Sequence, residues 1–256
     1  MSELIALTRA ISSAITRCEL AHLPRAPIDV EVARAQHRAY ERCLAEAGCT
    51  VVRLDAGPEM ADSVFIEDTA IVFDEMAIVT RPGAASRRQE TPAVAEALAR
   101  YRALQRIEAP ATADGGDVLV VDRTVFVGCS SRTNAAAIDQ MRQFLSSYGY
   151  TVAGVSVSGC LHLKSAVTRV ADDRLLINRE WLSIEPFSAF ELVDVHPDEP
   201  YGANALLVGG EVVYATSFPR TRARLEACEV RVRAIDVSEI AKAEGALTCC
   251  SLIFVA

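Results

Sequence analysis

The stretch Ala246-Leu-Thr-Cys-Cys-Ser-Leu-Ile-Phe-Val-Ala256 closes the chain and has the composition of a buried β-strand. Its last residues form an apolar run, and we expect the strand to cover residues 249–255. A chain that ends in a strand is tied into a sheet at its terminus. Two adjacent thiols, Cys249 and Cys250, stand at the start of this strand. Each is a candidate nucleophile, and the rest of the chain must supply the groups that would serve it.

The composition is that of an ordinary globular protein. Of 256 residues, 51% are hydrophobic and 23% are charged, and we expect residues 1–256 to form a single domain with a sizeable core. The formal net charge is −8, which argues against nucleic acid or an anionic membrane as the main partner. An acidic protein is compatible with a small cationic substrate, and the sequence leaves a homodimer open.

The cysteine and histidine patterns favour a cytoplasmic protein without a metal site. The eight cysteines form no CxxC pair, and the four histidines have no spacing typical of zinc ligands. The N-terminus lacks the features of a signal peptide, and no apolar run approaches the roughly 18 residues of a membrane span. We therefore predict reduced thiols, a cytoplasmic location and no cofactor.

The chain repeats one pattern, a β-hairpin followed by a helix and a further strand. The hairpins are predicted to begin near residues 67, 115, 164, 204 and 248. The last unit is complete only if the C-terminal strand pairs with a strand over residues 3–9. Five such units, closed by that pairing, predict an α/β ring without an open sheet edge. The expected helices cover residues 29–47, 91–104, 132–147, 221–227 and 238–243, with a strand near 105–109 and an irregular linker at 179–190.

Chemically active side chains recur at the start of the predicted hairpins. Taken singly, each has a structural explanation, because a cysteine at a strand start is usually core and an aspartate before two glycines is usually a turn residue. In a ring of equivalent units, equivalent positions converge, so together they would provide a thiol, a base and several carboxylates. These residues are Glu67 and Asp68, Asp114, His162, Asn204 and Cys249.

Short segments spread over most of the chain carry a combined motif. They are Asp62-Ser-Val-Phe-Ile-Glu-Asp68, Thr80-Arg-Pro-Gly-Ala-Ala-Ser-Arg-Arg88, Thr112-Ala-Asp-Gly-Gly-Asp-Val118, Arg132-Thr-Asn134, Leu161-His-Leu-Lys-Ser165, Ala203-Asn204, Pro219-Arg-Thr-Arg222 and Leu247-Thr-Cys-Cys-Ser251. Together they resemble the dimethylarginine dimethylaminohydrolases of the guanidine-modifying superfamily. The resemblance implies a pentein fold, a five-bladed α/β propeller of ββαβ repeats closed by pairing of the N- and C-terminal strands. It implies a hydrolase of Nω-methylated arginines that releases citrulline, with residues 10–28 as a lid.

The resemblance also implies a role for each site residue. Cys249 would be the nucleophile, His162 the general acid and base, and Asp114 the carboxylate that orients His162. Cys250 would point to the opposite face of the strand, into the core. The substrate-binding residues would be Asp68 with Glu67 for the guanidinium, Arg87 and Arg132 for the α-carboxylate, Asp62 for the α-amino group, and Phe65 for the aliphatic arm.

The chemistry of a guanidinium group fits this set of residues. Its carbon is a poor electrophile because the charge is delocalised, so an enzyme needs carboxylates to polarise it and a soft nucleophile to attack it. Asp68 and Glu67 can accept its planar N–H donors in a fork geometry. Without substrate, the same carboxylates would raise the pKa of the Cys249 thiol, and we expect the resting thiol to be neutral.

Three other functions remain open from the residues. An arginine or agmatine deiminase would use similar groups, although two carboxylate-binding arginines favour an amino acid over agmatine. A non-catalytic binding protein with a five-bladed fold, such as a ribosome anti-association factor, is expected to lack the thiol, histidine and carboxylate set. A redox sensor using Cys249 and Cys250 would need a strained disulfide between neighbours.

Overall fold

The computed structural model describes residues 3–256, so residues 1 and 2 of the expected domain lie outside the described part. Its strands form five sheets of three strands each. In every sheet the middle strand pairs antiparallel with one neighbour and parallel with the other. The sheets are β3 (Ala70–Val72), β4 (Met76–Val79) and β5 (Ala103–Arg106); β6 (Val118–Val121), β7 (Thr124–Cys129) and β8 (Thr151–Ser156); β9 (Val167–Arg169), β10 (Arg174–Ile177) and β11 (Glu191–Asp194); β12 (Leu206–Val208), β13 (Glu211–Ala215) and β14 (Val232–Ile235); and β15 (Leu252–Val255), β1 (Leu4–Arg9) and β2 (Thr50–Leu54).

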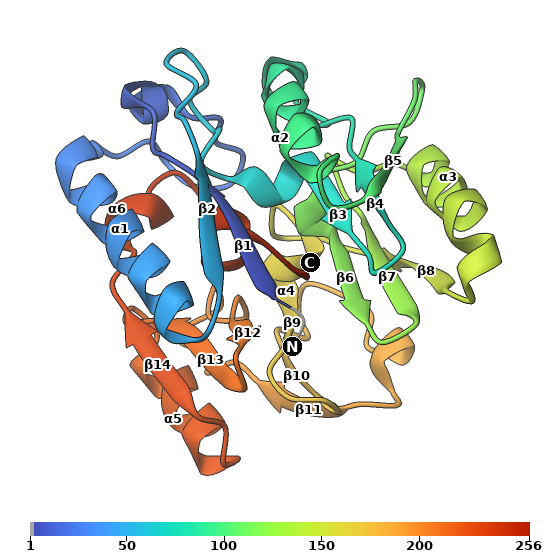
Figure 1. Ribbon diagram of the computed structural model, residues 1–256. Helices are drawn as coiled ribbons and strands as arrows, with labels where there is room; N and C mark the ends of the chain where they lie inside the picture. Colours follow the sequence, from blue (N-terminus) through green and yellow to red (C-terminus); the bar gives the residue numbers. More distant parts are fainter. Residues whose placement is uncertain (1–2) are drawn as a thin grey trace.

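The last of these sheets joins the two ends of the described chain. β15 pairs antiparallel with β1, with Leu4 opposite Val255 and Leu7 opposite Leu252. β2 then pairs parallel with β1. In Figure 1 the C-terminal end of the ribbon lies beside β1 near the centre of the molecule. The strand pairing that the sequence required for a fifth unit is therefore present.

Helices connect the second and third strands of most sheets and lie towards the outside of the molecule in Figure 1. α1 (Val30–Glu46) begins after Asp29, whose side chain accepts the first free backbone N–H groups, and it buries Tyr40 and Leu44. Between β10 and β11 only the short 3₁₀ turn Glu185–Phe187 forms, within the linker predicted to be irregular. The other helices are α2 (Thr91–Leu98), α3 (Ala135–Leu145), α4 (Leu163–Ala166), α5 (Pro219–Ala227) and α6 (Ser238–Ala241). Within residues 3–256, no helix has the length and apolar character needed to cross a bilayer.

One strand of each sheet borders a common hollow. The hollow has a volume of about 340 Å³ and is lined by residues of β3, β6, β9, β12 and β15. The side chains of Glu67, Lys164 and Thr248, from segments that precede three of these strands, line it as well. Five segments remote in sequence therefore meet around one space.

Four of the five hairpins begin with a helical turn where a strand was expected. The turns are Ile66–Thr69, Gly115–Asp117, α4 and Thr248–Cys250, in front of β3, β6, β9 and β15. The final strand therefore begins at Leu252, and the prediction of a strand from residue 249 is wrong. Cys249 and Cys250 diverge because successive residues on a 3₁₀ turn are about 120° apart, not because they alternate along a strand.

The helix predicted over residues 91–104 is also too long. α2 ends at Leu98, and β5 starts at Ala103, two residues before the expected strand. Alanine and arginine residues continue the helical pattern, but β5 must lie in register with β4, where Ala103 is opposite Met76. The Arg102 guanidinium donates to the backbone oxygen of Phe73, between β3 and β4, and so holds the chain between α2 and β5 against that hairpin. Strand pairing overrides helix propensity here.

Candidate active site

The turns in front of the hairpins, with the loops beside them, bring most of the predicted site residues to one cavity. The cavity has a volume of about 20 Å³, roughly the space of one water molecule. Asp114 contacts His162 from outside this lining, and Glu67 faces the central hollow instead. The predicted residues that line the cavity are Asp62, Phe65, Asp68, Arg87, Arg132, His162 and Cys249.

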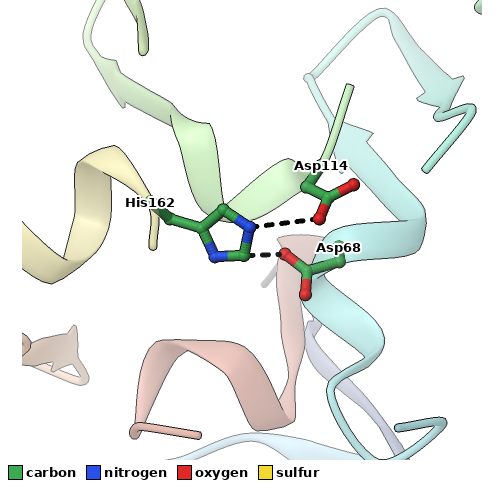
Figure 2. A group of neighbouring side chains, drawn as sticks. All are labelled: Asp68, Asp114 and His162. Carbon is green, nitrogen blue, oxygen red and sulfur yellow. Dashed lines mark hydrogen bonds and ion pairs between the residues drawn. The ribbon is translucent and has the colours of Figure 1, made fainter. Parts of the chain in front are cut away.

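Two buried carboxylates face the imidazole of His162, one near each ring nitrogen, and both lie on the same side of the ring in Figure 2. Its Nε2 is 3.1 Å from Oδ2 of Asp114, and its Nδ1 is 3.9 Å from Oδ1 of Asp68. Burial lowers the pKa of His162, but the carboxylates of Asp68, Asp114 and Asp117 outweigh burial and raise this pKa to about 9. The imidazole is therefore positively charged at neutral pH and can donate a proton.

Two glycines allow the backbone to approach these side chains closely. A Cβ atom on Gly116 would lie 2.6 Å from Nδ1 of His162 and 2.9 Å from Oδ1 of Asp68. The Gly116 N–H donates to the same Asp68 oxygen at 3.0 Å. A Cβ atom on Gly115 would lie 2.0 Å from the backbone oxygen of Glu67. Close packing of the site segments therefore requires the Gly-Gly pair, which local sequence alone explains as a turn.

Asp68 is held in its charged form. Burial raises its pKa, but His162, Arg87 and the Gly116 N–H outweigh burial and hold the pKa at about 2. Arg87 is buried, and its Nη1 donates to Oδ2 of Asp68 at 2.5 Å. Its Nη2 is 2.9 Å from Glu90 and 2.9 Å from the backbone oxygen of Phe65. The guanidinium of Arg87 thus already has protein partners on both of its terminal nitrogens.

Arg132 and Asp62 stand at the same cavity with fewer partners. Arg132 is partly buried, and among residues 3–256 its side chain makes no hydrogen bond or ion pair. The Asp62 carboxylate accepts the backbone N–H of Glu19 at 3.2 Å. Burial raises the pKa of Asp62, and Arg87 lowers it in part. This pair of opposite charges could receive the two charged groups of an amino acid.

The Cys249 thiol lines the cavity and is protonated. Burial and then the carboxylates of Glu67 and Asp68 raise its pKa to about 12. The neighbouring Cys250 is buried away from the cavity, and its Sγ donates to the backbone oxygen of Ala246 at 3.5 Å. Only the first of the two thiols reaches the cavity, and it would need a cation beside it to ionise.

Glu67 belongs to a buried polar network behind the cavity. Lys164 Nζ donates to its Oε1 at 2.6 Å, and Thr248 Oγ1 donates to its Oε2 at 2.9 Å. Asn204 Nδ2 donates in turn to Thr248 Oγ1 at 3.0 Å. Burial raises the pKa of Glu67, and the Lys164 ammonium lowers it. The network connects the segments that carry Asp68, His162 and Cys249.

A covering segment, defined here as residues 19–23, is fastened beside the cavity by a carboxylate. Glu244, which lines the cavity, accepts the backbone N–H groups of Ala21 at 3.0 Å, His22 at 2.6 Å and Leu23 at 2.5 Å. The segment lies within residues 10–28, where a lid was expected. Because about 20 Å³ is far too little space for an amino acid, part of the cavity lining must move before a substrate can bind, and the covering segment borders the cavity.

One group of side chains has the spacing of a metal site. Among the described residues it consists of Asp68, Asp114 and His162, whose ligand atoms all lie within 4.8 Å of one another. Each carboxylate already accepts protein donors, since the Gly83 N–H donates to Asp114 at 2.9 Å and Arg87 pairs with Asp68. The Asp114–His162 hydrogen bond and these donors therefore already engage the three side chains.

Sequence reasoning did not identify several charged or polar residues of the site. Lys164 follows His162 by two positions, and Thr248 precedes Cys249 directly. Their signal was a polar residue beside a candidate catalytic residue in an otherwise apolar segment. Glu90 and Glu244 had no such signal, because their partners are set by the tertiary fold.

Several known proteins similar to this chain are described as dimethylarginine dimethylaminohydrolases. A family model described as N,N dimethylarginine dimethylhydrolase, eukaryotic, matches residues 24–185. The N(G),N(G)-dimethylarginine dimethylaminohydrolase of Pseudomonas aeruginosa is 35% identical over 228 residues, which are 88% of this chain and 90% of the relative. The protein of the same name from Streptomyces coelicolor is 37% identical over 249 residues, which are 96% of this chain and 95% of the relative.

The similarity extends to a solved structure over nearly the full length. The Pseudomonas aeruginosa enzyme, studied as a cysteine-to-serine mutant complexed with citrulline, superposes with a TM-score of 0.94. The alignment covers 99% of this chain and 100% of the other, at 32% sequence identity. The α/β fold with five three-stranded sheets is therefore shared with that enzyme.

Proposed function

The chain belongs to the dimethylarginine dimethylaminohydrolase family, and from this membership and the site geometry we propose that it hydrolyses Nω-methylated L-arginines. The reaction cleaves a guanidino C–N bond and releases L-citrulline with dimethylamine or methylamine. The observation that carries the proposal is that Cys249, His162 and Asp68 line one cavity together with Arg132. A non-catalytic binding protein has no use for these four groups, and agmatine has no carboxylate for Arg132; family membership favours methylated arginines over arginine.

Cys249 acts as the nucleophile and His162 as the general acid and base. Asp68, assisted by Glu67 from the network behind the cavity, binds the substrate guanidinium. The bound cation lowers the pKa of the Cys249 thiol, so that the thiolate forms only when substrate is present. Asp114 orients the imidazole of His162. The distance of 3.1 Å between its Oδ2 and Nε2 of the ring supports this role.

The reaction proceeds in two halves. The thiolate of Cys249 attacks the guanidino carbon while the imidazolium of His162 protonates the departing methylated amine, and the C–N bond breaks. A covalent S-alkylthiouronium on Cys249 remains. The now neutral His162 takes a proton from water, and the resulting hydroxide adds to the same carbon. The thiolate leaves with the C–S bond electrons, and the C–OH hydrogen is lost to solvent as the urea carbonyl forms. Citrulline is released and the imidazolium is restored.

The amino-acid end of the substrate lies toward Arg132 and Asp62. Arg132 pairs with the α-carboxylate, and Asp62 receives the α-amino group once the Glu19 N–H has moved away. Arg87 adds a fixed positive charge and one remaining Nη1 hydrogen toward the carboxylate, since its other donors are engaged by Asp68, Glu90 and backbone oxygens. The Phe65 ring packs against the aliphatic arm.

The whole chain, residues 1–256, acts as one catalytic domain. Its sheets are the blades of a five-bladed pentein propeller that closes where β15 pairs with β1, and the hollow shared by one strand of each sheet supports this arrangement. The net charge of −8 supports a cationic small molecule as the partner rather than nucleic acid or membrane. The protein works in the cytoplasm, with reduced thiols, without a cofactor, and as a monomer or homodimer.

A substrate panel tests the proposed activity. The protein is incubated separately with asymmetric dimethylarginine, monomethylarginine, arginine and agmatine, and citrulline or carbamoylputrescine is assayed. We expect citrulline from the two methylated arginines, with dimethylamine or methylamine in equal amount, and little product from agmatine because it lacks the carboxylate that Arg132 binds. Turnover of arginine alone would overturn the proposed substrate class.

A further inference from the structure

Asp117 is a fully buried carboxylate that does not line the cavity. It follows Asp114 by three positions on the helical turn in front of β6, and none of its surface is exposed. Its Oδ1 accepts the backbone N–H of Leu163, the residue after His162, at 2.9 Å. Its Oδ2 accepts the hydroxyl hydrogen of Ser130 at 2.6 Å. The first contact holds the backbone that carries the catalytic histidine.

Ser130 extends the contact to the other side of the site. Its Oγ accepts the backbone N–H groups of Arg132 at 3.0 Å and of Thr133 at 3.3 Å. The Thr133 hydroxyl oxygen accepts the backbone N–H of Asp114 at 3.1 Å. One carboxylate is therefore connected, by at most two intervening side chains, to the segments of His162, Arg132 and Asp114.

We propose that Asp117 is a positioning residue that fixes the His162–Asp114 pair relative to the Arg132 guanidinium. The proposal rests on the function proposed above, because Arg132 and His162 must act on opposite ends of one substrate. A misplacement of about 1 Å between such groups can cost about 10²-fold in rate. Asp117 does not touch substrate and acts only through Leu163 and Ser130.

A carboxylate is the only side chain that satisfies both contacts at position 117. The Ser130 oxygen already accepts two N–H groups, so its hydroxyl must donate, and the Leu163 N–H must donate as well. An asparagine offers one acceptor and one donor, and either orientation leaves two donors facing each other. A longer side chain has no room, because even a Cβ atom on Gly128 would lie 2.7 Å from Oδ1 of Asp117.

The charge of Asp117 also acts on the titratable groups around it. Burial raises the pKa of Asp117 to about 6, so it is mostly ionised at pH 7 and above. The groups that face it are His162 and Cys160: its charge raises the pKa of His162, and burial followed by its charge raises the pKa of Cys160. Removal of this charge should therefore lower the pKa of the catalytic imidazole, an effect that a purely structural contact would not have.

Two variants separate the contacts of Asp117 from its charge. In Asp117→Asn we expect kcat to fall by about 10²-fold, KM to rise, and the alkaline limb of kcat/KM to move to lower pH. In Ser130→Ala the charge beside His162 is kept, so we expect a raised KM with an unmoved alkaline limb. The matched control is Glu199→Gln, because Glu199 is likewise a buried carboxylate with two protein donors, in its case the backbone N–H groups of Arg220 and Thr221, away from the cavity. It should lose stability but keep kcat, KM and the alkaline limb.

The outcomes decide the proposal in each case. If Asp117→Asn folds and has the kcat, KM and alkaline limb of the wild type, the proposal is overturned. If Asp117→Asn does not fold, an unchanged KM in Ser130→Ala overturns it. Failure of the proposed function is visible in the wild-type protein, as absence of turnover. In that case the imidazole pKa of His162 is followed by NMR, and no decrease in Asp117→Asn relative to wild type would overturn the inference.

Discussion

Cys249 and His162 lie among carboxylates that raise the pKa of both side chains. The same effect suppresses the reactive form of the thiol and favours the charged, proton-donating form of the imidazole. The carboxylates of Glu67 and Asp68 suppress the Cys249 thiolate, and Asp68, Asp114 and Asp117 stabilise the imidazolium. The empty site therefore holds a protonated thiol beside a protonated base, which is unreactive. A guanidinium bound at Asp68 would supply the missing positive charge, so nucleophile activation is coupled to substrate binding.

The two adjacent thiols should respond differently to the same substitution. Cys249→Ser should lower turnover of methylated arginines by at least about 10³-fold, because an unactivated hydroxyl is a much weaker nucleophile than a thiolate. Cys250→Ser should keep the activity and lose roughly 1 kcal/mol of unfolding free energy, since a hydroxyl is less favourable than a thiol in this buried site. Turnover and urea unfolding of both variants check this. Loss of activity in Cys250→Ser alone would contradict the nucleophile assignment.

The raised pKa of His162 has a defined consequence for stability. Because the pKa in the folded protein, about 9, exceeds the ordinary value of roughly 6.5, the imidazolium stabilises the fold fully below pH 6.5, and this contribution is lost as pH rises through 9. The difference in unfolding free energy between wild type and His162→Gln should therefore shrink between pH 6.5 and 9. Urea titrations at several pH values measure it. A difference that stays constant over this range would mean that the pKa is not raised.

At the scale of elements, the helical turns in front of the hairpins decide where the reactive groups point. On a strand, alternate side chains would face opposite sides of the sheet. On the turn Ile66–Thr69, the adjacent Glu67 and Asp68 instead reach the central hollow and the cavity. The turn Thr248–Cys250 likewise directs Thr248 to the hollow and Cys249 to the cavity. Each of these two turns thus directs one side chain into the cavity and the adjacent side chain into the central hollow.

The covering segment should open more readily when its carboxylate is replaced. Glu244→Gln exchanges charge-assisted hydrogen bonds to Ala21, His22 and Leu23 for neutral ones, which costs about 1 kcal/mol, roughly a fivefold shift toward the open state. We expect Cys249 in the free protein to react about fivefold faster with iodoacetamide, as followed by mass spectrometry.

Glu229→Gln provides the control for this substitution. Glu229 also has a positive φ, 61° against 57° for Glu244, but it is exposed on another part of the surface. Its replacement should leave the alkylation rate of Cys249 unchanged. Equal alkylation rates in wild type and Glu244→Gln would show that Glu244 does not hold the covering segment.

At the scale of the whole molecule, the β1–β15 pairing joins the ends of the described chain and positions the nucleophile. β15 begins three positions after Cys249, and it packs between β1 and the neighbouring sheet, where β3 lies. Phe254 is buried in the cluster that contains Leu7, Ile66 and Leu98. Damage to this seam should therefore reduce stability and activity together.

Phe254→Ala tests whether the β1–β15 pairing and the activity are coupled. Removal of a buried phenylalanine ring should cost about 3 kcal/mol of unfolding free energy, and Phe254 also packs edge-on against Tyr101. Thermal unfolding and turnover are measured together with Val255→Ala, the exposed neighbour on the same strand, which should change neither by much. A large loss in Val255→Ala, or none in Phe254→Ala, would contradict the seam as a determinant of stability.

The order of elements, the repeated unit and the pairing of the terminal strands follow from local patterns of apolar residues and turns, which depend on only a few neighbouring residues. The same patterns put Asp114, His162 and Cys249 at equivalent positions. The partners of these groups could not be read in this way. Lys164 meets Glu67 across 97 positions and Glu244 meets His22 across 222, and hydrogen bonds exist only within a few tenths of an ångström of the right distance. The sequence by itself therefore identified Asp114, His162 and Cys249 as the reactive groups. The packing of remote segments determined their protonation and orientation and placed the covering segment beside them.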